Sequence, residues 1–216
     1  MIDDLKCVIF DMDGVIIDSE PLHKKAYFET FEFVGADVNE ELYHTFTGSS
    51  TLNAFQRLVD HFNLDENPED LVREKRRRYV NYFENDPNLH LVEGVEDIIK
   101  YFYNKGYTLI LASSSAMVNI NRVFDRFDLQ QYFKAKISGA DLKESKPHPE
   151  IFEKAAVLGC YPKENCIVIE DSDNGIQAAN DAGIFVYGYK NPLVDNQTLQ
   201  NANAVIENFS ELKQWF

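Results

Sequence analysis

Residues 7–14 of the sequence read CVIFDMDG. The first four residues of this stretch form a short, wholly apolar run, which predicts a strand buried on both faces. Side chains alternate along a strand, so Asp11 and Asp13 start from the same face where the strand ends, and Gly14 lets the backbone turn away. The stretch therefore predicts a buried strand that delivers two carboxylates to its carboxyl end.

Similar runs recur along the chain and alternate with helical periodicity, which is typical of a parallel sheet covered on both faces. The stronger runs are TLILA at 108–112, CIVIE at 166–170 and IFVYGY at 184–189, and the weaker ones are AKISG at 135–139 and AVIE at 204–207. We therefore predict an α/β fold with a doubly wound, Rossmann-like parallel sheet.

One part of the chain breaks this alternation. Between about residues 19 and 88 no comparable strand occurs, and apolar residues return at three- and four-residue steps, as in STLNAFQRLVDHF. Polar connections on both sides would let this segment move as a lid. We predict a core of residues 1–17 and 88–216, with an all-helical cap at 18–87 inserted after the first strand.

Composition and charge narrow the class of protein. The 216 residues are 44% apolar and carry 36 acidic and 21 basic side chains, for a net charge of −15. This charge disfavours nucleic acid and anionic lipid as partners. No run approaches 18 apolar residues and no signal peptide is recognisable, so we expect a cytoplasmic monomer with no membrane partner. Cys7, Cys160 and Cys166 lack paired spacing and are expected to be reduced core thiols.

A second acidic pair, Glu170 and Asp171, follows another predicted strand. Ligands of open α/β sheets bind at the carboxyl edge of the strands, where both acidic pairs would meet. Crowded carboxylates are unfavourable unless a cation or a shared proton relieves them, so Mg²⁺ is a natural occupant. Taken alone, an Asp-x-Asp pair is more often an ordinary acidic turn.

Two further segments carry groups suited to phosphate. Ser113, Ser114 and Ser115 follow a predicted strand, and their hydroxyl and backbone N–H groups can hold phosphate oxygens. Alternatively, Ser114 or Ser115 is a plain helix cap. Lys146 lies before Pro147 and could offset both a carboxylate nucleophile and a phosphoryl oxygen, although a lone lysine is more often exposed.

In chain order, these residues resemble the four motifs of the haloacid dehalogenase superfamily, and the resemblance covers essentially the whole chain. The motif residues are Asp11-x-Asp13-Gly14, Ser113, Lys146 and Glu170-Asp171. The helical insertion resembles the cap of the branch that contains β-phosphoglucomutase and small sugar-phosphate phosphatases. The resemblance implies Mg²⁺-dependent transfer of a phosphoryl group through an aspartyl-phosphate.

The resemblance also implies a role for each motif residue. Asp11 would be the nucleophile and Asp13 the general acid and then base. Ser113 and Lys146 would hold the transferring phosphoryl oxygens. A second aspartate at the position of Asp13 is the mark of phosphotransferases, so dehalogenation is disfavoured. The implied Mg²⁺ ligands are the Asp11 carboxylate, the backbone carbonyl of Asp13, Asp171, and Glu170 directly or through water.

Residues of the cap and of the loop after the second motif would bind substrate. His23 matches a cap-edge histidine that couples acid–base chemistry to lid closure in the mutases, and Lys75 falls near a cap lysine that contacts substrate. Lys75 belongs to the basic run 73–78, which could equally be a solvated helix face. The full set of implied substrate-binding residues is His23, Gly48, Lys75, Ser114 and Ser115.

Two departures from the mutase pattern bear on the reaction. Mutases of this branch anchor the second phosphate with an arginine after a Gly-x-Ser turn and with a Lys-Asn pair after the second motif, whereas this chain has GSST at 48–51 and SAM at 115–117. Arg76 or Arg78 could supply an anchor from elsewhere. We therefore expect a phosphatase that acts on a small phosphorylated metabolite, a sugar or polyol phosphate. The alternatives are a β-phosphoglucomutase and a non-catalytic phosphometabolite-binding protein.

Overall fold

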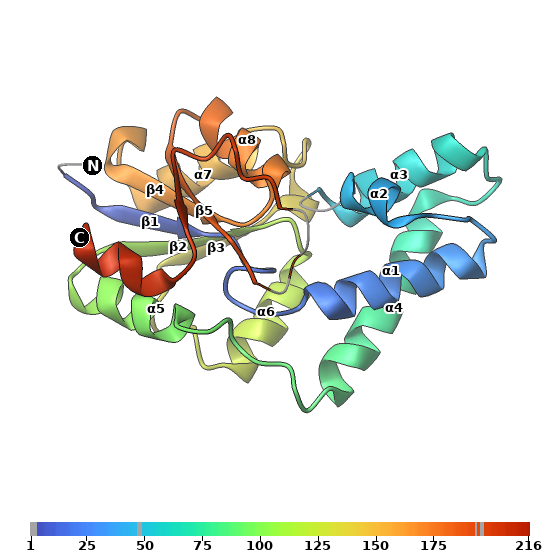
Figure 1. The fold of residues 1–216 in the computed structure, drawn as a ribbon, viewed down its shortest axis with the longest axis horizontal. Coiled ribbons are helices and arrows are strands. Elements are labelled where there is room, and N and C mark those ends of the chain that lie inside the picture. The colour runs from blue at the N-terminus through green and yellow to red at the C-terminus, as the bar shows by residue number, and fades with distance from the viewer. Residues whose placement is uncertain (1–3, 47–48, 193, 195–196) are drawn as a thin grey trace.

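The computed structural model describes residues 4–46, 49–192, 194 and 197–216. Its centre is a six-stranded sheet of order β3-β2-β1-β4-β5-β6, in which every neighbouring pair of strands is parallel (Figure 1). The predicted α/β fold and all six predicted strands are confirmed. The strands are β1 (Cys7–Phe10), β2 (Thr108–Ser113), β3 (Ala135–Ser138), β4 (Cys166–Glu170), β5 (Phe185–Tyr189) and β6 (Ala204–Ile206).

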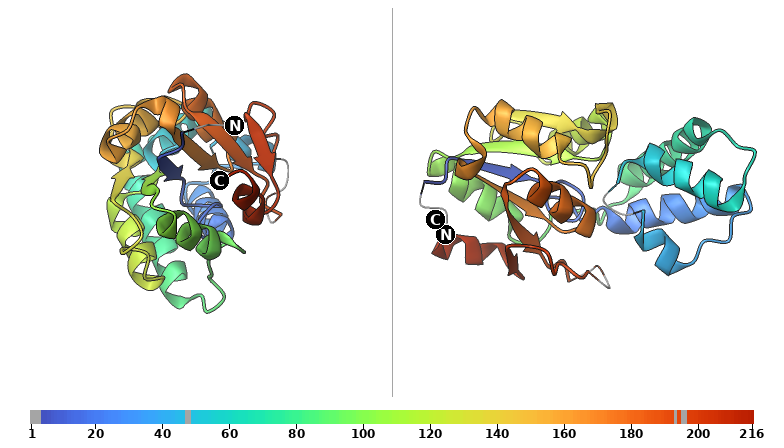
Figure 2. Two further views of the ribbon diagram at one scale, coloured as in Figure 1. Left: turned by 90° about the vertical axis from the view of Figure 1, so that its left-hand side faces the viewer. Right: turned by 90° about the horizontal axis from the view of Figure 1, so that it is seen from above.

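Helices cover both faces of the sheet, as the two views of Figure 2 show. One face packs against α5 (Val95–Asn104), α6 (Met117–Arg126) and the 3₁₀ helix Phe209–Gln214, and the other packs against α7 (Glu150–Gly159) and α8 (Asp173–Asp181). The two remaining 3₁₀ turns of the described chain are Gly139–Asp141 and Lys163–Asn165.

The alternation along β1 explains why two layers of helices are needed. Val8 and Phe10 lie in the apolar cluster on the α5 and α6 side, while Cys7 and Ile9 lie in the cluster on the α7 and α8 side. All four side chains are fully buried. Burying a large apolar side chain contributes roughly 1.5–3 kcal/mol, so a polar residue at any of these positions would weaken the fold.

Four helices follow β1 and lie beyond the carboxyl ends of the strands, to the right in Figure 1. They are α1 (Glu20–Phe33), α2 (Glu40–His44), α3 (Thr51–Phe62) and α4 (Pro68–Asn85). Tyr27, Phe31, Phe55 and Leu58 belong to an apolar cluster formed within this segment. This cluster is separate from the two that flank the sheet.

The helical segment is also connected to the core through its linkers. Ile17 pairs with Leu91 in an isolated antiparallel bridge, so the chain enters and leaves the segment at neighbouring points. Leu22 of α1 and Tyr79 of α4 join the apolar cluster of the α5 and α6 face. Arg126 of α6 also donates to the backbone carbonyl of Phe83, close to the end of α4.

The three cysteines are free thiols, but they do not share one environment. Cys7 and Cys166 are buried on neighbouring strands, as expected. The expectation of a core position for Cys160 is wrong. It takes a left-handed conformation with φ 65° directly after α7, where the chain turns away from the helix at the surface, and its side chain is exposed. No helix among the described residues is long and apolar enough to cross a membrane.

Candidate active site

Strand register brings the motif residues together. Phe10 of β1 lies opposite Leu111 of β2 and Ile169 of β4, so Asp11 lies level with the last residues of both neighbouring strands. A cavity of about 590 Å³ opens at this edge and is lined by core and cap. The predicted residues that line it are Asp11, Asp13, His23, Lys75, Ser113, Ser114, Ser115, Glu170 and Asp171.

Lys146 lies behind the cavity wall and is 2% exposed, so the alternative of a solvent-exposed lysine is excluded. Its Nζ donates to Asp11 Oδ1 at 2.5 Å, to Glu170 Oε1 at 2.7 Å and to the carbonyl oxygen of Ala112 at 3.2 Å. Burial alone would lower the pKa of Lys146, but the charges of Asp11 and Glu170 raise it above its ordinary value. The lysine is therefore a fixed positive charge that orients the first aspartate.

Asp11 is buried, and Lys146 holds one of its two oxygens. Burial raises the pKa of Asp11 to about 8, against the opposing effect of Lys146 and with a further contribution from the charge of Glu170. No residue that the structure describes forms a hydrogen bond to Oδ2. The second oxygen is thus available to a ligand in the cavity.

Asp13 has a different environment, built from hydrogen-bond donors. Its Oδ1 accepts from Ser19 Oγ at 2.5 Å and from His23 Nε2 at 3.0 Å, and its Oδ2 accepts from Ser115 Oγ at 2.8 Å. Burial would raise the pKa of Asp13, but His23 and the two hydroxyls outweigh it and lower the pKa below the ordinary range. In this arrangement Asp13 is ionised.

A chain of polar contacts links Asp13 to the cap. Because His23 Nε2 faces a carboxylate, it carries the proton, and Nδ1 accepts from Lys75 Nζ at 2.6 Å. The imidazole stacks on Tyr79 with 4.2 Å between ring centroids. Burial and the charge of Lys75 lower the pKa of His23, while burial lowers the pKa of Lys75 to about 8. The structure therefore places both predicted cap residues against the second aspartate.

Glu170 and Asp171 have different partners although they are adjacent. Glu170 accepts from Lys146 through Oε1 and from the backbone N–H and hydroxyl of Ser172 through Oε2. Ser172 also caps α8, as the sequence suggests, by accepting from the backbone N–H of Gly175. Burial and the charge of Glu170 raise the pKa of Asp171 well above its ordinary value. The core site thus holds more negative charge than Lys146 alone offsets.

The donor set fits Mg²⁺ in its chemistry. Among the described residues no three His, Cys, Asp or Glu side chains are grouped as a metal site. The implied direct ligands are the carboxylates of Asp11 and Asp171 and one backbone carbonyl, with Glu170 bound directly or through water, and all of these donors are oxygens. Gly14 preserves the room, since its φ is +83° and a Cβ there would collide with Oδ2 of Asp171.

The serine loop has two separate roles. Ser113 is buried and its Oγ accepts from the backbone N–H of Ser115, while the hydroxyl of Ser115 donates to Asp13. Ser114 lines the cavity. Neither Ser114 nor Ser115 caps α6, because the N-cap residue is Ala116, so the alternative of a plain helix cap is wrong.

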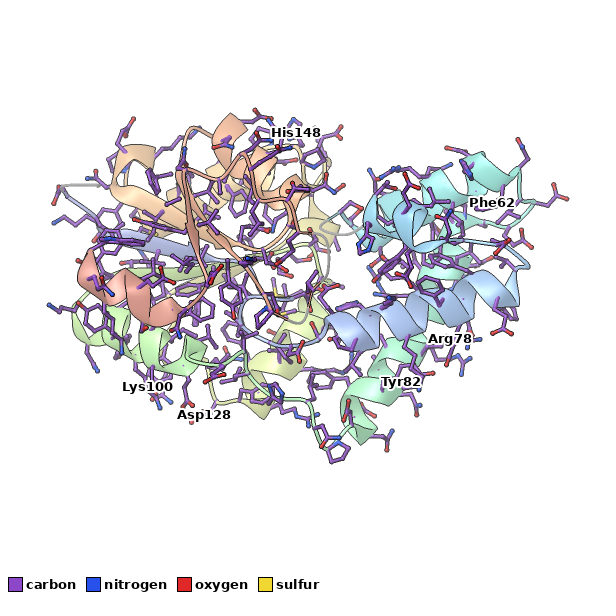
Figure 3. The ribbon with its side chains drawn as sticks, viewed as in Figure 1. Phe62, Arg78, Tyr82, Lys100, Asp128 and His148 are labelled. Carbon is purple, nitrogen blue, oxygen red and sulfur yellow. The ribbon has the colours of Figure 1, made fainter. Side chains whose placement is uncertain are left out.

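The other residues predicted to bind substrate from the helical segment, Gly48 and either Arg76 or Arg78, are not found in the described cavity lining. Gly48 lies outside the described residues. Arg78 and Tyr82, labelled in Figure 3, both bond to Glu29, and neither Arg76 nor Arg78 lines the cavity. The basic run 73–78 is therefore mainly a surface face, from which Lys75 alone lines the cavity.

Three residues near the site had no role predicted from the sequence. Ser19 is the N-cap residue of α1, and its position before a proline-containing first turn is a signal for a helix start. Glu20, the first residue of α1, lines the cavity. Gln197 donates to the backbone carbonyl of Asp171 at 2.8 Å from a loop with no distinctive pattern.

The parallel sheet and the cavity at its acidic edge are those of an α/β enzyme. The chain matches the haloacid dehalogenase-like hydrolases over residues 8–189 and belongs to that family.

Its relatives include enzymes of two kinds. A phosphorylated carbohydrates phosphatase of Thermotoga maritima is 31% identical over 93% of each chain. Fructose-1-phosphate phosphatase of Escherichia coli is 30% identical over 82% of this chain and 92% of its own. The crystal structure of β-phosphoglucomutase from Clostridium difficile superposes with a TM-score of 0.84 at 27% identity, covering 96% of this chain and 93% of that one.

Proposed function

We propose that the protein is a Mg²⁺-dependent phosphatase that hydrolyses a small sugar phosphate through an aspartyl-phosphate on Asp11. The observation that carries the proposal is the contrast between the two aspartates of one cavity. Asp11 is oriented by a buried lysine and has one oxygen toward the ligand, whereas Asp13 is held ionised by three donors. Such a division suits a nucleophile next to a proton carrier.

The proposed reaction has two displacements. Before the first displacement, Asp13 takes up a proton that is relayed from Lys75 through the two ring nitrogens of His23. An oxygen of Asp11 then attacks phosphorus, the bond between phosphorus and the ester oxygen breaks, and the departing oxygen takes that proton from Asp13. A water molecule then attacks the phosphoryl group on Asp11, giving its proton to Asp13 and releasing inorganic phosphate. The contacts of His23 and Lys75 place a proton donor beside Asp13 before the first displacement.

Mg²⁺, held by Asp11, the Asp13 carbonyl and Asp171, would offset charge on the transferring phosphoryl group. Lys146 and Ser113 would orient the nucleophile and the phosphoryl oxygens from the opposite side. We include in the proposal a cap at residues 18–87 that opens and closes over the cavity. Its support is the pairing of the two linkers at Ile17 and Leu91.

Hydrolysis is favoured over mutase chemistry by the charges in the cavity wall. A mutase must hold a bisphosphate in two orientations, which requires a cationic anchor far from Asp11. The described lining contains no arginine. Its lysines are engaged, since Lys24 pairs with Glu40 at 2.8 Å and Lys75 donates to His23.

The proposal is tested by phosphate release from a panel of sugar and polyol phosphates with Mg²⁺. Asp11→Asn should abolish release, while the control Asp181→Asn, at an exposed position on α8, should match the wild type. β-Glucose 1-phosphate with a bisphosphate primer separates the two enzymes. Formation of glucose 6-phosphate without free phosphate would favour the mutase, and no turnover of any ester would favour a binding protein.

A further inference from the structure

The cap side of the cavity has both an apolar and a polar component. Tyr27, Tyr43 and Phe46 provide aromatic surface, and Glu20 and Thr51 lie among the polar residues. The volume of about 590 Å³ lies in the range of small-molecule sites. A wall of this composition suits a ligand with both C–H and O–H groups.

The carboxylates in this wall differ in the partners that they have among the described residues. Lys24 neutralises Glu40, and Lys75 is bound to His23 with its ammonium 4.4 Å from the ring centroid of Tyr27. Glu20, in contrast, forms no hydrogen bond or ion pair with any residue that the structure describes. It is half-buried in the lining of the cavity.

Glu20 also lies close to the reacting groups. It follows Ser19, whose hydroxyl binds Asp13, and begins α1. Burial and the charge of Asp13 raise the pKa of Glu20 to about 7, while Lys75 opposes that shift. The protein groups around Glu20 thus stabilise an ionised carboxylate poorly, and a hydroxyl donor from a ligand would stabilise it.

We propose that Glu20 selects the substrate by the group that neighbours its phosphoryl-bearing carbon. Glu20 accepts a hydrogen bond from a hydroxyl at that position and repels an ester that carries a carboxylate or a second phosphate there. The preferred substrates are therefore monophosphates of neutral sugars or sugar alcohols. This inference rests on the proposed phosphatase function and assigns its specificity to a residue outside the catalytic motifs.

The test compares two esters of similar size, 2-hydroxyethyl phosphate and 2-phosphoglycolate. On the carbon that bears the phosphoryl group, the first carries a hydroxymethyl group and the second a carboxylate. The measured quantity is the ratio of their kcat/KM values. Both are measured at roughly one pH unit above the pKa of Glu20, so that its carboxylate is ionised. The wild type should prefer the hydroxyethyl ester. Glu20→Gln should reduce this preference by at least about tenfold, because it removes the repulsion between two neighbouring charges.

Two further variants make the result specific. Glu41→Gln removes an exposed charge of α2 outside the cavity lining, and its ratio should stay within about twofold of the wild type. Glu20→Asp keeps the charge but shortens the side chain, so it should still discriminate against phosphoglycolate while KM for the hydroxyethyl ester rises. The Asp variant provides the answer if the Gln variant does not fold.

The outcomes separate the two proposals. If the wild type hydrolyses these esters and Glu20→Gln leaves the ratio unchanged, the role of Glu20 is overturned and the phosphatase stands. A wild-type preference for phosphoglycolate also overturns the role of Glu20. If the wild type releases phosphate from none of the three esters, 2-hydroxyethyl phosphate, 2-phosphoglycolate and glucitol 6-phosphate, the phosphatase proposal fails and the specificity proposal fails with it.

Discussion

Replacing Lys146 with methionine should destabilise the protein strongly. The side chain is 2% exposed and forms ion pairs with two buried carboxylates, Asp11 and Glu170. Removing one partner of a buried ion pair costs about 3–5 kcal/mol, because the remaining charge has neither solvent nor a counter-ion. With a urea m-value of about 2.5 kcal/mol/M, a loss of about 4 kcal/mol lowers the unfolding midpoint by roughly 1.5 M.

The penalty should depend on pH in a defined direction. The pKa of Asp11 is already raised to about 8, chiefly by burial, and losing Lys146 raises it further. A carboxyl whose pKa is higher in the folded than in the unfolded state favours folding when protonated, so its contribution is present below about pH 4 and is lost as the pH rises toward 8. The Lys146→Met penalty should therefore be smallest in acid and grow toward neutral pH.

Urea unfolding followed by circular dichroism, in the absence of divalent metal, measures the effect. Lys154→Met is the matched control, because Lys154 forms an exposed helical pair with Glu150 that is worth about 0.5 kcal/mol or less. A Lys146→Met variant that loses no more stability than Lys154→Met would refute the electrostatic account of the core site.

Three other perturbations test separate parts of the site. Ser115→Ala removes a donor to the ionised form of Asp13, so the pKa of Asp13 rises and the acid limb of the pH profile of kcat/KM should move to higher pH; an unmoved limb would contradict this. Gly14→Ala should weaken Mg²⁺ binding by about tenfold or more in calorimetry, because its Cβ displaces Asp171, and unchanged affinity would speak against that ligand. Finally, removing Mg²⁺ with a chelator should lower Tm more at pH 8 than at pH 6. The pKa values of Asp11 and Asp171 are raised, so without metal these carboxyls stabilise the fold when they are protonated and lose that contribution as they ionise at higher pH. An equal shift at both pH values would contradict that reasoning.

Much of the sheet could be predicted because its strands are continuous apolar runs that few other structures tolerate. The helix α2 (Glu40–His44) could not, because its five residues are too short for periodicity to show. Cys160 was misplaced for a related reason. Residue type favours burial of cysteine, but the position after the end of α7 overrides that preference.

That the motif residues meet at one edge of the sheet could be predicted, because parallel strands must bring their carboxyl ends together. The partners that tune these residues could not. For Lys146 the pairing with a carboxylate nucleophile was expected but its burial was not, because no periodic context signals that burial and the contact with Asp11 joins residues 135 positions apart. Ser115 and His23 reach Asp13 from the core loop and the cap, and Gln197 reaches Asp171 from a loop without a pattern. Such contacts depend on how distant segments pack, which local sequence does not encode.

In the proposed reaction, Asp11 carries the phosphoryl group and Asp13 activates the water that removes it. An aryl phosphate tests this most directly, because nitrophenolate leaves without needing a proton, so Asp13→Asn should slow only the second displacement. With p-nitrophenyl phosphate and Mg²⁺, the account predicts a rapid burst of about one nitrophenolate per protein. Peptide mass spectrometry after acid quenching should then find the phosphoryl group on Asp11. Turnover by the wild type, with neither a burst nor a phosphorylated Asp11 in the Asp13→Asn variant, would contradict it.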